Sequence, residues 1–143
     1  LLAQLVVLPA LAALFRLIDR GVRISQDSQQ MAESVSGIRL AVLALVFAVG
    51  APLVEELFFR GLLLRSVEKR WGSTAAVVVS GGLFGLVHFE GSSALAAMAI
   101  VLSLALLGWA LAWLSVHYRR LGPALVAHLV FNAIAVASLV ASP

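Results

Sequence analysis

Residues 45–65 have the sequence LVFAVGAPLVEELFFRGLLLR, which is long and apolar enough to cross a bilayer. Three charged residues, Glu55, Glu56 and Arg60, lie near its centre. Its twelve strongly apolar side chains each favour insertion by about 0.3–0.6 kcal/mol, whereas each charge opposes it by about 2.5–3.5 kcal/mol. Because the charges outweigh the apolar gain, neighbouring helices must supply polar partners. Ionisable residues inside a span predict a functional site.

The composition is that of a polytopic membrane protein. Of 143 residues, 62% are hydrophobic and 12% are charged, whereas soluble domains are about half apolar and a quarter charged. The chain has no cysteine, which excludes disulfides and thiolate metal sites. Its net charge of +3 suits an anionic membrane surface, and no basic run interleaved with aromatics predicts nucleic-acid binding. The chain opens without Met on LLAQLVVLPALAALF, so we expect part of the N-terminal region to be missing.

The apolar pattern predicts one domain over residues 1–143, an all-α transmembrane bundle of about five helices with the site between them. The expected spans are residues 1–18, 38–67, 73–89, 94–116 and 124–140, and residues 19–39 form a polar loop. We expect Pro52 to kink the second span. Gly81, Gly82 and Gly85 offer a small face for close helix packing.

Loop charges predict the orientation of the bundle. The loops at residues 65–72 and 117–122 carry five basic residues against a single Glu68. The positive-inside rule places this side in the cytoplasm and the loops at 19–39 and 90–93 outside.

Three polar clusters inside the spans have helical spacing. Glu56 can reach Arg60 four residues on, whereas Glu55 projects about 100° away from Glu56. His88 lies four residues after Phe84, and His128 lies four before Asn132 on one helix face. On axial rise alone, His88 is about two turns from the middle of its own span, a gap that a tilted or displaced span would close.

These clusters suit an intramembrane hydrolytic site, in which an unpaired carboxylate activates water while imidazoles and an amide orient it and stabilise an oxyanion. The alternative is a buried ion pair with packed histidines. Six such residues in three spans favour the site, because each is costly in lipid. We expect His117 to be interfacial, and Ser80, Ser103 and Ser138 to bond to their own helices. Neither GxSxG nor HExxH is present.

The clusters match, in order and spacing, the three motifs of a known family. Glu55-Glu56 with Arg60, Phe84 with His88, and His128 with Asn132 resemble the CPBP family of membrane proteins, also called Abi, which includes CAAX prenyl proteases and bacteriocin-processing proteins. The resemblance covers about residues 51–133, including Trp71-Gly72 and GLFGLVH at residues 82–88.

The resemblance implies an endopeptidase with a glutamate-activated water. Glu55 would be the base and His88 would help to hold the water, while His128 and Asn132 would stabilise the oxyanion. Glu56, Arg60 and Phe84 would be structural supports. The metal-free form is preferred, and the alternative is a zinc ion held by Glu55, His88 and His128.

The expected function is cleavage of a peptide bond near the C-terminus of a membrane-associated peptide, either CAAX-like and prenylated or of the bacteriocin type. The expected location is a bacterial plasma membrane, with the site facing the cytoplasm. One rival is a non-catalytic membrane adaptor or bacteriocin self-immunity protein that keeps the fold. A proton or ion pathway is a third hypothesis, since Glu and His also form relays.

Overall fold

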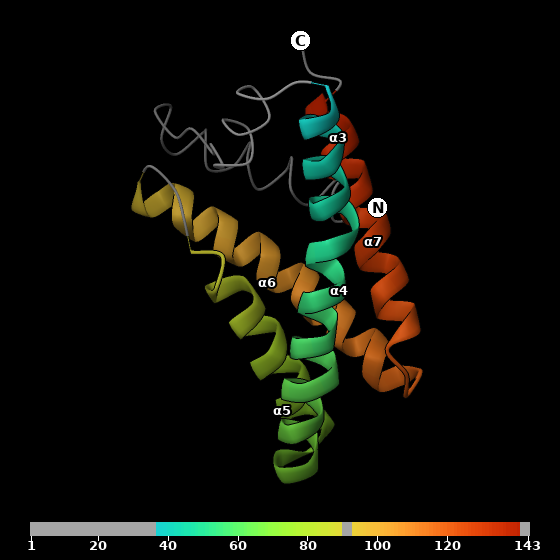
Figure 1. The fold of residues 1–143 in the computed structure, drawn as a ribbon. Coiled ribbons are helices and arrows are strands. Elements are labelled where there is room, and N and C mark those ends of the chain that lie inside the picture. Colours follow the sequence, from blue (N-terminus) through green and yellow to red (C-terminus); the bar gives the residue numbers. More distant parts are fainter. Residues whose placement is uncertain (1–36, 90–92, 141–143) are drawn as a thin grey trace.

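The computed structural model describes residues 37–89 and 93–140 and, for side chains, residues up to 138. Within these ranges the regular structure is entirely helical, which confirms the all-α fold (Figure 1). The expected first span and nearly all of the polar loop at 19–39 lie outside the described residues. The count of five spans therefore stays a prediction.

The opening motif lies on a long, nearly continuous helix. It comprises α3 (Ile38–Leu45), a π-helical stretch η2 (Val46–Gly50), α4 (Ala51–Glu56), a second π-helical stretch η3 (Leu57–Leu63) and the start of α5 (Leu64–Leu86). Pro52 does not end this helix. Gly50 and Ala51 keep helical dihedrals, and the hydrogen-bond register widens to the π form just before the proline.

The chain reverses direction inside α5, at Gly72. This residue has φ 83° and ψ 171°, a conformation that a side chain would strain. The bend divides α5 into residues 64–71 and 73–86, so the long apolar segment Ile38–Leu86 returns on itself as a helical hairpin.

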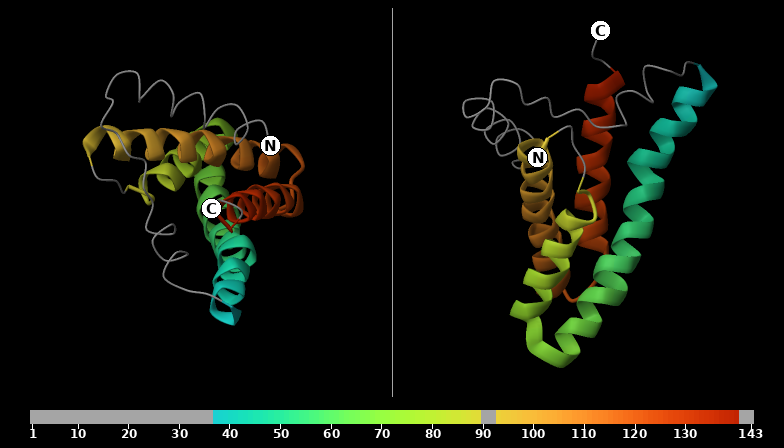
Figure 2. Two further views of the ribbon diagram at one scale, coloured as in Figure 1. Left: turned by 90° about the horizontal axis from the view of Figure 1, so that it is seen from above. Right: turned by 90° about the vertical axis from the view of Figure 1, so that its left-hand side faces the viewer.

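Two further helices follow within the described residues. Helix α6 (Ala94–His117) follows residues 90–92, and α7 (Gly122–Val140) follows a turn at residues 118–121. Helices α6 and α7 lie close together near this turn and diverge toward the other end (Figure 2). By length and composition, Ile38–Leu86 and Ala94–His117 can cross a membrane, and Gly122–Ser138 is a shorter apolar helix.

Small residues allow α5 and α6 to cross closely, as the sequence predicted. A Cβ atom on Gly81 would collide with Trp109, and one on Gly85 would collide with the Val101 carbonyl. Gly108 on α6 meets Gly81 in the same way. Gly82, in contrast, faces open space and is not part of the contact.

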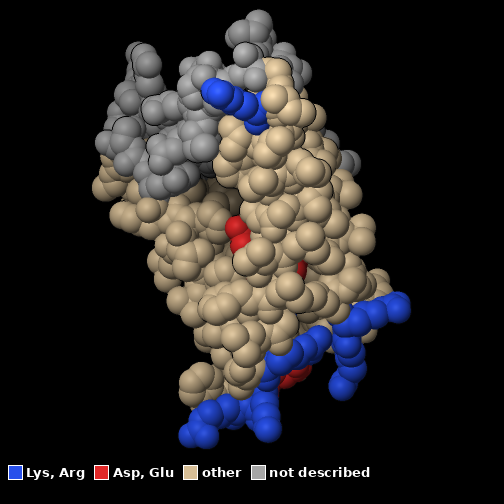
Figure 3. All heavy atoms as spheres, in the orientation of Figure 1, with Lys and Arg blue, Asp and Glu red and all other residues tan. Residues whose placement is uncertain are grey.

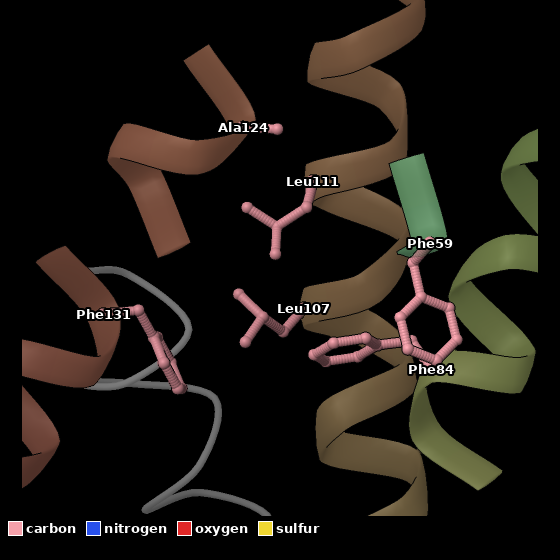
Figure 4. Close-up of a cluster of buried hydrophobic side chains, with 6 residues drawn as sticks. All are labelled: Phe59, Phe84, Leu107, Leu111, Ala124 and Phe131. Atoms are coloured by element: carbon pink, nitrogen blue, oxygen red, sulfur yellow. The ribbon is translucent and has the colours of Figure 1, made fainter. Parts of the chain in front are cut away.

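Apolar side chains from the hairpin, α6 and α7 form the core beside this crossing. One cluster joins four parts of the chain (Figure 4): it comprises Phe59, Phe84, Leu107, Leu111, Ala124 and Phe131. A second cluster lies toward the hairpin bend and comprises Leu64, Val67, Ala76 and Ala112. Helix α7 also packs against η2 and α4, which brings it to the helix that carries the glutamates.

Basic residues gather at one end of the bundle, below the apolar surface (Figure 3). Arg65 donates to Glu68 at 2.8 Å and to the Ser115 carbonyl at 3.0 Å. Hydrogen bonds from Ser73 and Arg65 lower the pKa of Glu68, which lies in this connecting region outside the membrane-spanning segments. His117 is exposed here and stacks on Trp113, as expected for an interfacial residue.

The orientation prediction can be tested with single cysteines, because the chain contains none of its own. Lys69→Cys at the basic end should react with a membrane-impermeant thiol reagent only from the cytoplasmic side. Ala94→Cys, at the start of α6, should react only from the other side. Labelling of both positions from one side would contradict the orientation.

Candidate active site

The site contains a buried ion pair between Arg60 and Glu56. Arg60 donates from one guanidinium nitrogen to Oε1 of Glu56 at 2.8 Å, and both side chains are fully buried. The other terminal nitrogen donates to the Gly108 carbonyl at 3.0 Å. The guanidinium carbon also lies 4.5 Å from the Phe84 ring centre. The predicted pair is therefore present, and its contacts link α4 and η3 to α5 and α6.

His128 extends this pair to α7. Its Nδ1 lies 2.9 Å from the same Oε1 of Glu56 that Arg60 contacts. Its Nε2 faces Oε2 of Glu55 at 3.6 Å, and the side chain is almost fully buried. Oε2 of Glu56 has no hydrogen-bond partner within the described part of the chain, so Oε1 alone holds both neighbours.

His88 approaches Glu55 from the other arm of the hairpin. It lies two residues past the end of α5, and its Nδ1 is 2.7 Å from the Phe84 carbonyl. Its Nε2 faces Oε1 of Glu55 at 3.8 Å.

The hairpin geometry explains how His88 reaches Glu55 despite the depth gap expected from the sequence. Glu55 lies 17 residues before Gly72 and His88 lies 16 after it, so the two arms are nearly equal. At 1.5 Å per residue, each side chain is about 25 Å from the bend. Counting from Gly72, rather than from the middle of the span, would have placed the two residues at one level.

Glu55 is the partly accessible member of the cluster. Its side chain is 26% exposed, whereas that of Glu56 is fully buried. The two adjacent carboxylates thus have different surroundings, as their helical offset predicted. Acidic atoms are visible in a hollow about midway up the apolar surface (Figure 3).

Asn132 lies one turn beyond His128, but its hydrogen bond leads elsewhere. Its Nδ2 donates to the carbonyl of Phe47 in η2 at 2.9 Å. The structure thus joins Glu55, Glu56, Arg60, His88 and His128 through direct contacts and places Asn132 at the edge of this group.

Two contacts of the site were not foreseen from the sequence. Ser80 donates to the Phe59 carbonyl on the facing arm at 3.0 Å, so the prediction that it bonds to its own helix was wrong. The acceptor of Arg60 on α6, Gly108, was also missed. Ser138 does bond to its own helix, at the Ile134 carbonyl, as predicted.

Comparison with protein-family models gives one match, over residues 37–134: type II CAAX prenyl endopeptidase Rce1-like. The chain belongs to this family. The match confirms the predicted relation to the CAAX protease family. The matched range includes every residue of the candidate site. Membership implies a protease of the CAAX type, and with the apolar helices it indicates an integral membrane protein. Searches of curated proteins and of solved structures gave no significant match.

The buried pair generates a stability prediction. Arg60→Ala should destabilise the protein by about 3–5 kcal/mol, because it leaves the buried Glu56 carboxylate without its cation. Thermal unfolding in detergent would measure the loss. Arg65→Ala is the matched control, since Arg65 also pairs with a glutamate but is 36% exposed, and exposed pairs contribute about 0–1 kcal/mol. Equal losses for the two variants would contradict the role of the buried pair.

Proposed function

We propose that the protein hydrolyses a peptide bond near the C-terminus of a membrane-associated peptide, using a water molecule activated by Glu55. The observation that carries the proposal is that Nε2 of His88 and Nε2 of His128 face the two oxygens of one partly exposed carboxylate. Their separations of 3.8 and 3.6 Å are longer than direct hydrogen bonds and suit groups that hold a water between them.

The second nitrogen of each ring favours this arrangement. A backbone carbonyl can only accept, so Nδ1 of His88 carries the proton that bonds to Phe84. Nδ1 of His128 likewise donates to the Glu56 carboxylate. In the neutral ring of His88, Nε2 then bears a lone pair that faces Glu55, whereas Nε2 of His128 in its protonated form carries a proton. A water donating one proton to Glu55 and one to an imidazole keeps its own lone pair for attack on a carbonyl carbon.

The proton steps follow from these positions. Glu55 removes a proton as the water oxygen bonds to the peptide carbonyl carbon, whose oxygen becomes an oxyanion. His128 in its protonated form donates Nε2–H to that oxyanion, and the Glu56 carboxylate stabilises the imidazolium. Glu55 then returns the proton to the leaving nitrogen as the C–N bond breaks. Asn132, the second donor expected from the family resemblance, has its amide on Phe47, so this scheme assigns the oxyanion to His128.

We propose the metal-free form of this chemistry, with zinc as the alternative. Glu55, His88 and His128 are chemically suitable donors, and both rings are oriented through Nδ1 in the manner of metal-binding histidines. However, no three acidic, histidine or cysteine side chains among the described residues are arranged as a ready-made metal site. If zinc is bound, it would polarise the carbonyl and acidify the water.

The surroundings of Glu55 favour a lipid-embedded substrate. Its helix exposes large apolar side chains on either side of it, and these are Leu53, Val54, Leu57 and Phe58. Such a surface suits a membrane-anchored peptide, including a prenylated CAAX-like one, and a bacteriocin-type peptide would also fit. We further propose a bacterial plasma-membrane location with the site reached from the cytoplasmic, basic side. His128 lies six residues after Gly122, about 9 Å along α7 from the basic turn.

Cleavage by the purified protein in liposomes tests the proposal. A panel of membrane-anchored peptides, with and without a prenylated C-terminal cysteine, should be cut near the C-terminus. His88→Ala should lower the rate by about 10²–10⁴-fold while the protein remains folded. Binding of the peptides by the folded protein without any cleavage would support the adaptor instead.

The same assay separates the two forms of the chemistry. A strong chelator should leave cleavage nearly unchanged if the water is activated by Glu55 alone. Loss of cleavage on chelation and recovery with zinc would instead assign Glu55, His88 and His128 as ligands.

A further inference from the structure

Pro52 leaves a carbonyl group without its helical donor. The Ala51 N–H bonds to the Val46 carbonyl, five residues back, in the π register of η2. The next bond in this register would run from the N–H of residue 52 to the Phe47 carbonyl. Proline has no N–H, so the helix cannot supply that donor. Inside a membrane, such a group is tolerated only where a neighbour satisfies it.

The neighbour is Asn132. Its Nδ2 donates to the Phe47 carbonyl at 2.9 Å, across 85 positions of sequence, and the side chain is half-buried between α7 and η2. The amide therefore occupies the place of the N–H that Pro52 lacks. The contact lies one turn from His128 on the same helix.

We infer that Asn132 is a positioning residue for His128. Its hydrogen bond to Phe47 fixes α7 against η2. In this position His128 contacts Glu56 and at the same time faces Glu55. Pro52 and Asn132 act as a pair, because the proline creates the acceptor that the amide fills. The effect on cleavage rests on the proposed function, whereas the effect on helix packing does not.

The pair can be separated by restoring the missing donor. Asn132→Ala should lower the thermal midpoint, and kcat should fall by about 10- to 100-fold with little change in KM, because His128 rather than the substrate is displaced. Pro52→Ala returns an N–H to the helix, so this variant should match or exceed the wild-type midpoint. The double variant Pro52→Ala/Asn132→Ala should recover most of the lost stability and of kcat.

Asn132→Asp is the matched control, since an ionised carboxylate keeps the shape but cannot donate to Phe47. It should behave like Asn132→Ala, and Pro52→Ala should rescue it as well. The inference is overturned if Asn132→Ala keeps the wild-type midpoint and loses cleavage without rescue, as expected of an oxyanion donor. It is also overturned if the double variant unfolds as early as Asn132→Ala. The stability measurements decide the matter even if no peptide is cleaved, which keeps this test apart from that of the proposed function.

Discussion

One buried oxygen, Oε1 of Glu56, holds the site together. It accepts from Arg60 within its own helix and from His128 on α7, and Arg60 continues to the Gly108 carbonyl on α6. Each of these groups would be costly alone in an apolar interior, and together they compensate one another's charge and hydrogen-bonding needs. The same polar contacts that make the charged span tolerable therefore also fix the ring of His128 beside Glu55.

The surrounding fold brings the remaining residues within reach of this oxygen. Gly72 allows the reversal that sets His88 level with Glu55, and the glycines of α5 and α6 allow the crossing on which Gly108 meets Arg60. Burial then gives the two neighbouring glutamates different surroundings. Glu56 is enclosed with the Arg60 cation, whereas Glu55 stays partly accessible between the two imidazoles.

Local features of this arrangement could be predicted from the sequence, and long-range ones could not. The helices follow from apolar runs, and the Glu56–Arg60 pair follows from i to i+4 spacing, because both depend on neighbours along one helix. The contacts from His128 to Glu56, from Ser80 to Phe59 and from Asn132 to Phe47 depend on how separate helices rotate and slide against one another. Spacing within one helix carries no information about how separate helices are placed. The position of Gly72 is an exception, because counting residues from it places His88 at the same depth as Glu55.

The proposed mechanism depends on Glu55 as the base. Glu55→Gln tests this role when peptide cleavage and thermal unfolding are measured on the same preparation. The amide keeps the shape and polarity of the side chain but cannot take a proton from water. If Glu55 is the base, cleavage falls by at least about 100-fold while the unfolding midpoint stays at the wild-type value. Glu68→Gln, at the basic end, should retain cleavage. If Glu55→Gln cuts at the wild-type rate, Glu55 is not the base and the proposed mechanism is wrong.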